Sequence, residues 1–525
     1  MKKSIPIRVS PDIAANHELL NRRLAKELGV PLSDITGYDL KKKSIDARGQ
    51  QVLINLNVDV FINEPYYPAV PKTYHFPELP SHARSVVIIG AGPAGLFAAL
   101  RLIELGIQPI ILERGKDVKS RRRDLALLNK QGIIHPDSNY CFGEGGAGTY
   151  SDGKLYTRSN KRGDIQRILQ LFCQFGAAPE ILISAHPHIG TNKLPQIITA
   201  MRQQIIDAGG LVHFEKKVSD FIIENNSISK VMTSDGDSFT ADAYILATGH
   251  SARDIFELLY HKKIQIEAKP FALGVRAEHP QLLIDQVQYH CKIRNEHLPP
   301  AAYSWVEQVD DRGVFSFCMC PGGIIAPAST APEELVVNGW SPSKRNNPYA
   351  NSGIVVQVTE EDVAKAMSAA GISPEHPLLF LYFQQMVEKN AYIAGGGKFV
   401  APAQRLVDFC ENKISSSLPD NSYLPGLNSV DLSSVLPDFI VKKLKGGFRK
   451  FGKKMKGYYT NDAVVVATES RTSSPVRIPR NKENGQHPQI NNLYPCGEGA
   501  GYAGGIVSAA MDGERVAQWI GMQMK

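Results

Sequence analysis

The sequence predicts an α/β protein of several domains, and three observations support this class. The chain has 525 residues, more than one compact domain usually contains. A glycine-rich turn at residues 90–95 stands between an apolar strand and an apolar helix. A second glycine-rich turn, at residues 499–504, has the same setting near the end of the chain. We therefore expect one Rossmann-like domain built from two separated segments, with other domains before and between them.

The composition is that of an ordinary globular protein. Hydrophobic residues make up 43% and charged residues 21% of the chain, which excludes a largely disordered protein, a coiled coil and a collagen-like fibre. The net charge of +7 is mild for this length and does not by itself indicate a nucleic-acid partner. Seven scattered cysteines, an odd number, do not form a disulfide framework and favour a reducing compartment.

Neither a signal peptide nor a transmembrane segment is expected. Pro6 and Arg8 interrupt any apolar core behind Met1. The longest uncharged apolar run, residues 85–100, is too short and too rich in glycine and proline to span a membrane. We expect a soluble cytoplasmic protein.

Residues 1–80 read as a small α+β domain. A strand at 5–10 is followed by a helix at 15–29, whose leucines 19, 20, 24 and 28 share one face and whose stop signal is Gly29. Two further strands are expected at 41–48 and 50–62. The Pro-rich stretch 64–84 reads as an ordered linker packed on the next domain.

Residues 81–265 read as the first segment of the Rossmann-like domain. A strand at 85–89, the glycine turn, a helix at 96–105 and a strand at 109–112 form a βαβ start. Helices near 163–176 and 193–208 follow. A strand meander then closes on the buried strand 244–247.

The pattern of expected elements changes at residue 266, and residues 266–459 are expected to form an inserted α+β substrate domain. Strand-like pieces at 271–278, 313–319, 334–340 and 353–358 alternate with longer helices. The last segment, 460–525, returns to the pattern of apolar strand, glycine turn and helix.

The first glycine turn has the spacing of a dinucleotide-binding site. Gly90 permits the tight turn, Gly92 lets the backbone approach a diphosphate, and Gly95 lets helix and strand pack closely. The free N–H groups and dipole of the following helix favour an anion. Glu113, at the end of the next strand, is placed to bind a ribose hydroxyl. The alternative is a tight turn without ligand and a solvated glutamate.

The second turn, Gly499–Gly504, does not predict a second dinucleotide. Too few residues follow it to supply another strand with a ribose-binding acid. Its helix is expected to direct its N-terminus at another part of the same cofactor. Thr248 and Gly249 form a third turn at a strand end, for which a simple turn is the alternative.

The motifs GAGPAG (90–95), LERG (112–115), ATG (247–249) and PCGEGAGYAGGI (495–506) together resemble FAD-binding oxidoreductases of the two-dinucleotide-binding-domain type. With GEGGAGTYSDGKL (143–155), KPFALGVRAEHP (269–280), FCMCPGG (317–323) and ESRTSSPVRIPR (469–480), the chain more closely resembles the uncharacterised FAD-dependent, or NAD(FAD)-utilising, dehydrogenase family. This resemblance covers nearly the whole chain.

The resemblance implies noncovalent FAD held by a set of residues spread over both segments. The Gly90 turn would hold the diphosphate, Glu113 the ribose, Val218 the adenine and Gly505 the flavin pyrimidine. Glu498 stands where flavoproteins of this type commonly have aspartate. The implied cofactor-binding residues are Gly90, Gly92, Pro93, Ala94, Gly95, Glu113, Arg114, Gly146, Ala147, Gly148, Thr149, Val218, Thr248, Gly249, Gly497, Glu498, Gly505 and Ile506.

Two cysteines precede a glycine pair in Cys318-Met319-Cys320-Pro321-Gly322-Gly323. A redox pair is one interpretation. With a single intervening residue the disulfide ring is small and strained, so we expect reduced thiols and expect residues 321–323 to lie against the isoalloxazine. Candidates for the wall of the substrate site are Cys320, Gly322, Gly323, Arg471 and Ser473, and none has an assigned catalytic role.

Three other features carry weaker hypotheses. Residues 439–461 contain eight Lys and Arg and no acid, which is typical of a solvated helix face and, alternatively, of a nucleic-acid or membrane surface. His135, His186, His188 and Cys141 lack metal-ligand spacing, so we predict no metal. Ser251 lies outside a G-x-S-x-G motif, so a hydrolase is not indicated.

The sequence therefore predicts an FAD-dependent oxidoreductase, dehydrogenase-like, that transfers hydride at flavin N5 to or from an unidentified small molecule. NADH or NADPH would serve at most as a transient electron donor, because only one complete ribose-binding βαβ motif is present. The alternatives are an FAD-containing protein that modifies nucleic acid such as tRNA, and a non-catalytic flavin redox sensor. A nucleic-acid partner is not the expected outcome.

Overall fold

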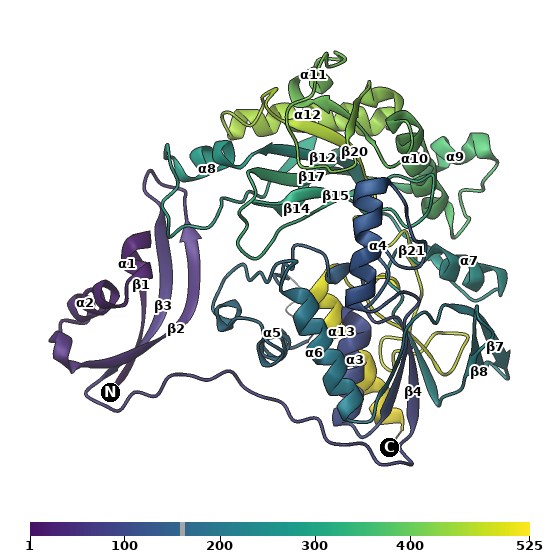
Figure 1. The fold of residues 1–525 in the computed structure, drawn as a ribbon, viewed down its shortest axis with the longest axis horizontal. Coiled ribbons are helices and arrows are strands. Elements are labelled where there is room, and N and C mark those ends of the chain that lie inside the picture. Colours follow the sequence, from purple (N-terminus) through teal and green to yellow (C-terminus); the bar gives the residue numbers. More distant parts are fainter. Residues whose placement is uncertain (158–162, 525) are drawn as a thin grey trace.

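A small α+β domain begins the chain and stands at one side of the molecule (Figure 1), which is described here from a computed structural model that covers residues 1–157 and 163–524. Its three antiparallel strands have the order β1-β3-β2. Leu20 and Leu24 are buried, whereas Leu19, expected on the same face, is 40% exposed. The elements are β1 (Lys2–Val9), α1 (Pro11–Ala15), α2 (His17–Leu28), the short 3₁₀ helix η1 (Leu32–Asp34), β2 (Ile35–Asp46) and β3 (Leu53–Ile62).

The predicted helix at 15–29 corresponds to α2 in the structure, and the sequence did not indicate the short helix α1 that precedes it. Asn16 has an extended backbone (φ −113°, ψ 114°), which ends α1 and lets its side chain cap α2 by accepting from the Leu19 N–H at 3.1 Å. Gly29 ends α2 in the left-handed conformation, with φ 67°. The stop signal in the sequence is thus confirmed, and the start lies two residues later than expected.

The linker after β3 packs on the following domain, as the sequence indicates. Its Tyr74 N–H donates to the Gln174 side chain at 2.8 Å, and its Leu79 N–H donates to the Ala208 carbonyl at 2.9 Å. Phe76 is buried among apolar residues of that domain. The N-terminal domain also touches it directly, because the Lys43 N–H donates to the Ile183 carbonyl at 2.8 Å.

A parallel sheet of five strands forms the nucleotide-binding domain, in the order β22-β10-β4-β5-β6. Alternate strand residues enter two apolar clusters, so both faces of the sheet are covered. Helices α3, α6 and α13 lie side by side on one face (Figure 1). The strands are β4 (Ser85–Ile89), β5 (Gln108–Leu112), β6 (Leu211–His213), β10 (Ala243–Leu246) and β22 (Leu493–Pro495).

The helices expected near 163–176 and 193–208 and the strand meander are present, whereas α4 and α7 are helices that the sequence did not indicate. The meander β7-β8-β9 is antiparallel and packs, with α7, on the second face of the sheet. The helices are α3 (Pro93–Glu104), α4 (Val118–Gln131), η2 (Gly146–Gly148), α5 (Ile165–Gln174), η3 (Pro179–Leu182), α6 (Leu194–Asp207), α7 (Arg253–His261) and α13 (Ile506–Gln523). The meander strands are β7 (Val218–Glu224), β8 (Ser227–Thr233) and β9 (Ser238–Phe239).

A seven-stranded sheet forms the inserted domain, at the top of Figure 1. All its pairs are antiparallel except β18-β19. In spatial order its strands are β13 (Val306–Val309), β14 (Arg312–Cys320), β17 (Tyr349–Gln357), β12 (Ala272–Pro280), β20 (Val464–Glu469), β18 (Ala401–Arg405) and β19 (Leu427–Ser429).

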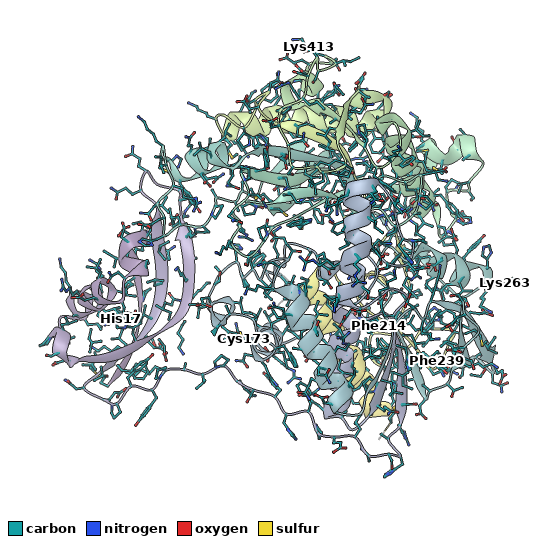
Figure 2. The ribbon with its side chains drawn as sticks, viewed as in Figure 1. His17, Cys173, Phe214, Phe239, Lys263 and Lys413 are labelled. Atoms are coloured by element: carbon teal, nitrogen blue, oxygen red, sulfur yellow. The ribbon has the colours of Figure 1, made fainter. Side chains whose placement is uncertain are left out.

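Helices and two small ribbons complete the inserted domain. Figure 2 shows Lys413 at the top edge of this domain and His17 on the N-terminal domain at the left. The helices are α8 (Gln281–Tyr289), α9 (Glu360–Met367), η4 (Ser368–Ala370), α10 (Leu379–Gly395), α11 (Leu406–Cys410), η5 (Leu432–Ser434) and α12 (Asp438–Lys454). The ribbons pair β11 (Glu267–Ala268) with β21 (Val476–Arg477), and β15 (Ile324–Pro327) with β16 (Val337–Trp340).

One domain boundary differs from the prediction. The strand expected to open the second segment of the nucleotide-binding domain at residue 460 is β20, which pairs with β12 and β18 in the inserted sheet. All six residues of β20 are buried. A continuous apolar run indicates a strand covered on both faces, and it does not distinguish a parallel strand from a central antiparallel one. The chain returns to the parallel sheet only at β22.

Candidate functional site

The glycine turn between β4 and α3 is shaped by backbone contacts at two of its three glycines. A Cβ on Gly90 would lie 2.5 Å from the Ala247 carbonyl oxygen, and one on Gly95 would lie 2.0 Å from the Gly90 carbonyl oxygen. Both are closer than real Cβ atoms approach. Gly90 also has φ +109°, which other residues rarely adopt. These two glycines therefore allow the turn itself.

Gly92 meets different surroundings. A Cβ here would touch only the Gly146 Cα, at 4.0 Å, and the backbone (φ −75°, ψ −177°) is ordinary. Gly92 caps α3 without any side-chain hydrogen bond to the first free N–H groups of the helix. Open space thus stands before an uncapped helix N-terminus, which is a favourable place for an anion.

Glu113, at the end of β5, joins the loops around this turn. Its Oε2 accepts from the Ala91 N–H, and its Oε1 accepts from the N–H groups of Gly115 and Gly143, each at 2.9 Å. The side chain is 4% exposed and borders the cavity described below. A carboxylate offers about four acceptor positions. Backbone N–H groups occupy three of these acceptor positions on Glu113, and one remains for a ribose hydroxyl.

The turns at the ends of β10 and β22 pack against each other and leave glycines facing open space. A Cβ on Gly499 would lie 2.5 Å from the Gly249 carbonyl oxygen. Gly249 (φ +73°) and Gly505 (φ +127°) have nothing within 4 Å of their Cβ positions. Gly505 is the N-cap of α13, again with no side-chain cap. A second uncapped helix N-terminus therefore opens beside the first.

These turns border one cavity of about 420 Å³. It lies at the carboxyl ends of β4, β5 and β10, where ligands bind in open parallel sheets. It extends to the inserted domain, where Phe317 and Cys318 of β14 and Trp340 of β16 contribute to its wall. The predicted residues that line it are Gly90, Gly92, Pro93, Ala94, Glu113, Arg114, Gly146, Ala147, Gly148, Val218, Thr248, Gly249, Glu498, Gly505 and Ile506.

Three predicted residues lie behind the cavity wall. Gly95 packs on Gly90, as its close contact requires. Thr149 is fully buried and donates from Oγ1 to the Glu144 carbonyl at 2.7 Å. Gly497 donates its N–H to Asp512 at 2.8 Å, and a Cβ there would lie 2.9 Å from Ala94. These positions hold the lining residues in place.

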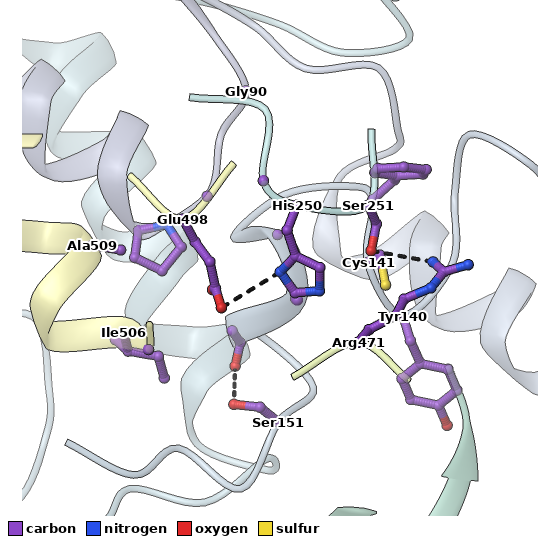
Figure 3. Close-up of a pocket in the computed structure, with 18 of the residues that line it drawn as sticks. Gly90, Tyr140, Cys141, Ser151, His250, Ser251, Arg471, Glu498, Ile506 and Ala509 are labelled. Atoms are coloured by element: carbon purple, nitrogen blue, oxygen red, sulfur yellow. Dashed lines mark hydrogen bonds and ion pairs between the residues drawn. The ribbon is translucent and has the colours of Figure 1, made fainter. Parts of the chain in front are cut away.

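Two side chains that line the cavity face each other (Figure 3). His250 Nδ1 and Glu498 Oε1 are 3.5 Å apart, and each comes from a loop that follows a strand of the parallel sheet. The longer glutamate, which differs from the aspartate common in similar flavoproteins, thus contacts the neighbouring loop. The sequence offered no signal for His250, because a histidine after a strand-end glycine has many ordinary roles.

Arg471, a predicted wall residue, lines the cavity and belongs to a buried charge network. Its guanidinium contacts the Glu388 carboxylate at 2.9 Å and donates to Ser251 Oγ at 3.2 Å (Figure 3). Arg253 of α7 also contacts Glu388, at 2.8 Å, and contacts Glu334 at 2.6 Å. Burial alone would raise the pKa of Glu388, but the two guanidinium groups lower it to about 2.

The cysteine motif differs from the sequence-based expectation. Residues 321–323 are buried away from the cavity, since a Cβ on Gly322 would lie 1.7 Å from the Arg345 carbonyl oxygen and one on Gly323 would lie 2.5 Å from that of Trp340. The glycines serve packing within the inserted domain. Cys318 lines the cavity and is exposed, whereas Cys320 is fully buried.

Lys154 is a lining residue that the sequence analysis did not single out. Its Nζ lies 3.8 Å from Cys318 Sγ, 3.5 Å from Cys320 Sγ and 3.4 Å from Asp152 Oδ2. Burial would lower the pKa of the ammonium, but the two thiols and Asp152 hold it above its usual range. Ser473, another wall candidate, is not at the cavity and accepts from Lys269 at 3.4 Å.

Within residues 1–157 and 163–524, no group of three or more His, Cys, Asp or Glu side chains is arranged to hold a metal ion. Over the same residues, no helix has the length and apolarity needed to cross a membrane.

Three parts of the chain match known sequence families. Residues 83–130 match the FAD binding domain family, and residues 270–472 match the family described as FAD-dependent protein, C-terminal domain-like. Residues 1–61 match a domain of unknown function. The second match includes β20, in agreement with its place in the inserted sheet.

A relative matches over nearly the full length. It is an uncharacterized protein from Clostridium beijerinckii, 38% identical over 521 residues, which cover 96% of this chain and 95% of that protein.

Two solved structures show a looser similarity. 2,6-Dihydroxypyridine-3-hydroxylase from Arthrobacter nicotinovorans has 10% identity, covers 84% of this chain and 83% of its own, and has a TM-score of 0.37. A geranylgeranyl bacteriochlorophyll reductase-like protein from Thermoplasma acidophilum has 13% identity, covers 84% and 79%, and has a TM-score of 0.35. These similarities are too weak to bear on the chemistry of this chain.

The parallel sheet, the glycine turns with their two open helix N-termini, and the FAD binding domain match define an FAD-binding flavoprotein. FAD is its cofactor. The chain belongs to the family of FAD-dependent proteins that includes the uncharacterized Clostridium beijerinckii protein.

Proposed function

We propose that this protein is an FAD-dependent oxidoreductase, dehydrogenase-like, that acts on a small-molecule substrate in the cavity between the parallel sheet and the inserted domain. The observation that supports this proposal best is that the glycine turns and polar side chains of a second domain line the same cavity. Bound FAD would supply two-electron chemistry at N5 of its isoalloxazine. The protein would bind the flavin, orient it toward the substrate and shield both from solvent.

The residues present fit noncovalent FAD. The N-terminus of α3 beside Gly92 would bind the diphosphate, because a helix N-terminus offers free N–H donors and a favourable dipole. Glu113 would use its remaining acceptor position for the adenosine ribose, with Arg114 and Val218 further along the same wall. Gly249 and Gly505 leave room where a side chain would otherwise project into the cavity.

The opposite end of the cavity has the groups that a substrate would meet. Lys154 provides a positive charge, Cys318 a thiol and Asn338 an amide, while Tyr140 and Trp340 supply aromatic surface. Burial raises the pKa of Tyr140, so its hydroxyl remains a neutral donor at neutral pH. This end can bind a polar or anionic group next to an aromatic wall.

The test is the identity and release of the cofactor. The purified protein should be yellow, and heat should release FAD rather than FMN, in a ratio near one per chain. The released flavin is identified by chromatography against both standards. A colourless protein that does not take up FAD on reconstitution would refute the proposal.

NADH or NADPH, if used, should bind weakly and transiently as an electron donor. Among the residues that the structure describes, only the β4-α3-β5 unit has both the glycine turn and the acidic strand end of a dinucleotide site. Calorimetry on the FAD-loaded protein checks this expectation. A tight, stoichiometric NAD(P) complex beside bound FAD would contradict it.

A further inference from the structure

Lys154 lies between the two sulfur atoms of the bulged end of β14. Its Nζ is within 4 Å of both Cys318 Sγ and Cys320 Sγ, so one ammonium group contacts both thiols. In a regular strand, residues two apart lie on the same face but remain well separated. Here β14 has a register shift between Phe317 and Cys320, and Cys318 has φ +50°. The bulge therefore changes the ordinary spacing of the two cysteines.

The backbone conformation of Cys318 is unusual for a residue with a side chain. Non-glycine residues rarely adopt a positive φ, and such conformations cluster at functional sites. Arg276 supports this one, since its Nη2 donates to the Cys318 carbonyl at 2.6 Å while its Nη1 contacts Glu469 at 2.7 Å. Arg276 and Glu469 are both buried. A buried ion pair thus holds the backbone that places the Cys318 thiol in the cavity.

The two cations around Asp152 outnumber their one carboxylate partner. Asp152 is shared between Lys154, at 3.4 Å, and Arg345, at 3.3 Å, and no other carboxylate forms an ion pair with either cation among the described residues. His188 lies 3.7 Å from Asp152, and burial lowers its pKa to about 4, so it is neutral at pH 7. One positive charge therefore faces the cavity beside the two thiols.

From these contacts we propose that Cys318 is a reactive thiol paired with the Lys154 ammonium, and that Cys320 is its partner in a reversible disulfide. Cys318 is exposed to the cavity and would exchange with a thiol or disulfide substrate, while the buried Cys320 would close the ring. Burial raises the pKa of Cys320 to about 11, which agrees with a partner that is a neutral thiol until Cys318 is oxidised.

The balance of this reaction is that of a dithiol oxidation. Two S–H bonds break, one S–S bond forms, and two protons and two electrons leave. Bound FAD would accept the two electrons together with the two protons, so this inference rests on the proposed function and specifies its substrate class as thiols and disulfides. The sequence alone disfavours a disulfide with one intervening residue. The bulge and the shared cation are tertiary features that favour the redox alternative.

The test measures the cysteines themselves. Holoprotein is equilibrated anaerobically with reduced and oxidised glutathione at a series of ratios, quenched with acid and alkylated. Each oxidised glutathione that closes the disulfide yields two molecules of reduced glutathione. Trypsin releases residues 313–344 as one peptide that contains Cys318 and Cys320 and no other cysteine. Mass spectrometry then reads both sites at once.

The peptide should lose both alkylation sites together and reversibly as the buffer becomes oxidising, while Cys173 on α5 (Figure 2) stays alkylated. Full alkylation of the peptide at every ratio would overturn the proposal. Glutathione on Cys318 with a free Cys320 would overturn the pairing. FAD content is recorded on the same samples: a protein without FAD would refute the proposed function, and the thiol result would still be read independently.

A second measurement tests whether Lys154 increases the reactivity of Cys318. Lys154→Met should slow alkylation of Cys318 by iodoacetamide at least tenfold, because the negative charge that forms on the sulfur as it reacts loses the neighbouring ammonium. The matched control is Lys365→Met on the exposed side of α9, which should leave the rate unchanged. An unchanged rate in Lys154→Met, with its FAD content intact, would contradict the Lys154–Cys318 pair.

Discussion

At the scale of single residues, Gly92 and Gly95 lie three positions apart in one turn and have different tasks. The space at Gly95 is filled by the Gly90 carbonyl, whereas the space at Gly92 is open and faces the cavity. A motif match treats the two glycines alike. Only the surroundings of each Cβ position separate a glycine required by the fold from one required by the ligand.

Gly92→Val should fold and lose FAD. A Cβ at this position would meet no protein atom closer than 4.0 Å and the side chain would occupy the space before α3, so FAD affinity should fall by at least about tenfold, or ~1.4 kcal/mol. Flavin absorbance of the purified variant and its far-UV circular dichroism check this. The comparison is Gly95→Val, which should fail to fold. A yellow, fully loaded Gly92→Val variant would exclude this turn as the diphosphate site.

The burial of His279 predicts that the stability of the fold depends on pH. The buried ring packs on Tyr458 at a centroid distance of 4.3 Å and its Nε2 donates to the Tyr458 carbonyl at 2.9 Å. Burial lowers its pKa to about 4, below the 6.5 of an exposed histidine. Between these values the unfolded chain binds a proton that the folded chain does not, so stability should fall as pH decreases from 6.5 to 4.

His279→Phe should weaken this dependence, because the variant has no imidazole to protonate. The difference from the parent over this window should be on the order of 3 kcal/mol. It is measured from urea unfolding at several pH values. Some dependence should remain, since the pKa of His188 is also lowered to about 4. Identical slopes for variant and parent would show that His279 is not a buried neutral group.

At the scale of elements, helix α12 shows how a basic sequence becomes an ordinary surface helix. Its apolar side is buried in the inserted domain. Lys443 contacts Asp310 and Asp311, Lys454 pairs with Glu307, and Lys450 donates to the Gln308 carbonyl. These acids and carbonyls belong to β13 and the turn after it. Two of the eight cations that suggested a nucleic-acid surface, Lys443 and Lys454, therefore already pair with acids of the domain.

The triple variant Lys450→Gln, Lys453→Gln, Lys454→Gln should keep its fold and its FAD. Exposed ion pairs contribute about 1 kcal/mol or less, so the thermal midpoint should change by only a few degrees. Differential scanning fluorimetry and flavin absorbance are the measurements. If the parent retained RNA through purification and the triple variant did not, the nucleic-acid alternative would gain support over this prediction.

At the scale of the whole molecule, a buried charge network joins the two large domains. Arg253 comes from α7 of the nucleotide-binding domain, Glu388 from α10 of the inserted domain, and Arg471 from the segment after β20. Their side chains are less than 10% exposed. Because Arg471 also lines the cavity, the network connects domain packing with the shape of the site.

Glu388→Gln should destabilise the protein by about 3–5 kcal/mol, because it leaves two buried guanidinium groups with less compensation. Chemical unfolding of the variant and parent gives the difference. Glu361→Gln, an exposed position on α9, is the control and should change little. A Glu388→Gln variant as stable as the parent would mean that water or Glu334 compensates both arginines.

The sequence by itself determined the features that depend on local patterns. The apolar run before Gly90, the spacing to Glu113 and the glycines near residue 500 indicated the parallel sheet, the FAD site and its two segments, because backbone conformation at these turns demands particular residues. Periodicity also indicated most helices, including the stop at Gly29. These signals lie within a few residues of the structure that they specify.

Tertiary structure alone decided what depends on partners distant in the chain. It placed β20 in the inserted sheet. An apolar run indicates a buried strand, but it does not specify which strands will pair with it. The tertiary structure buried Gly322 and Gly323 against Arg345 and Trp340, and it brought Lys154 to the two cysteines more than 160 residues away. A side chain's chemistry is set by its contacts, and contacts over such separations leave no periodic signal in the sequence.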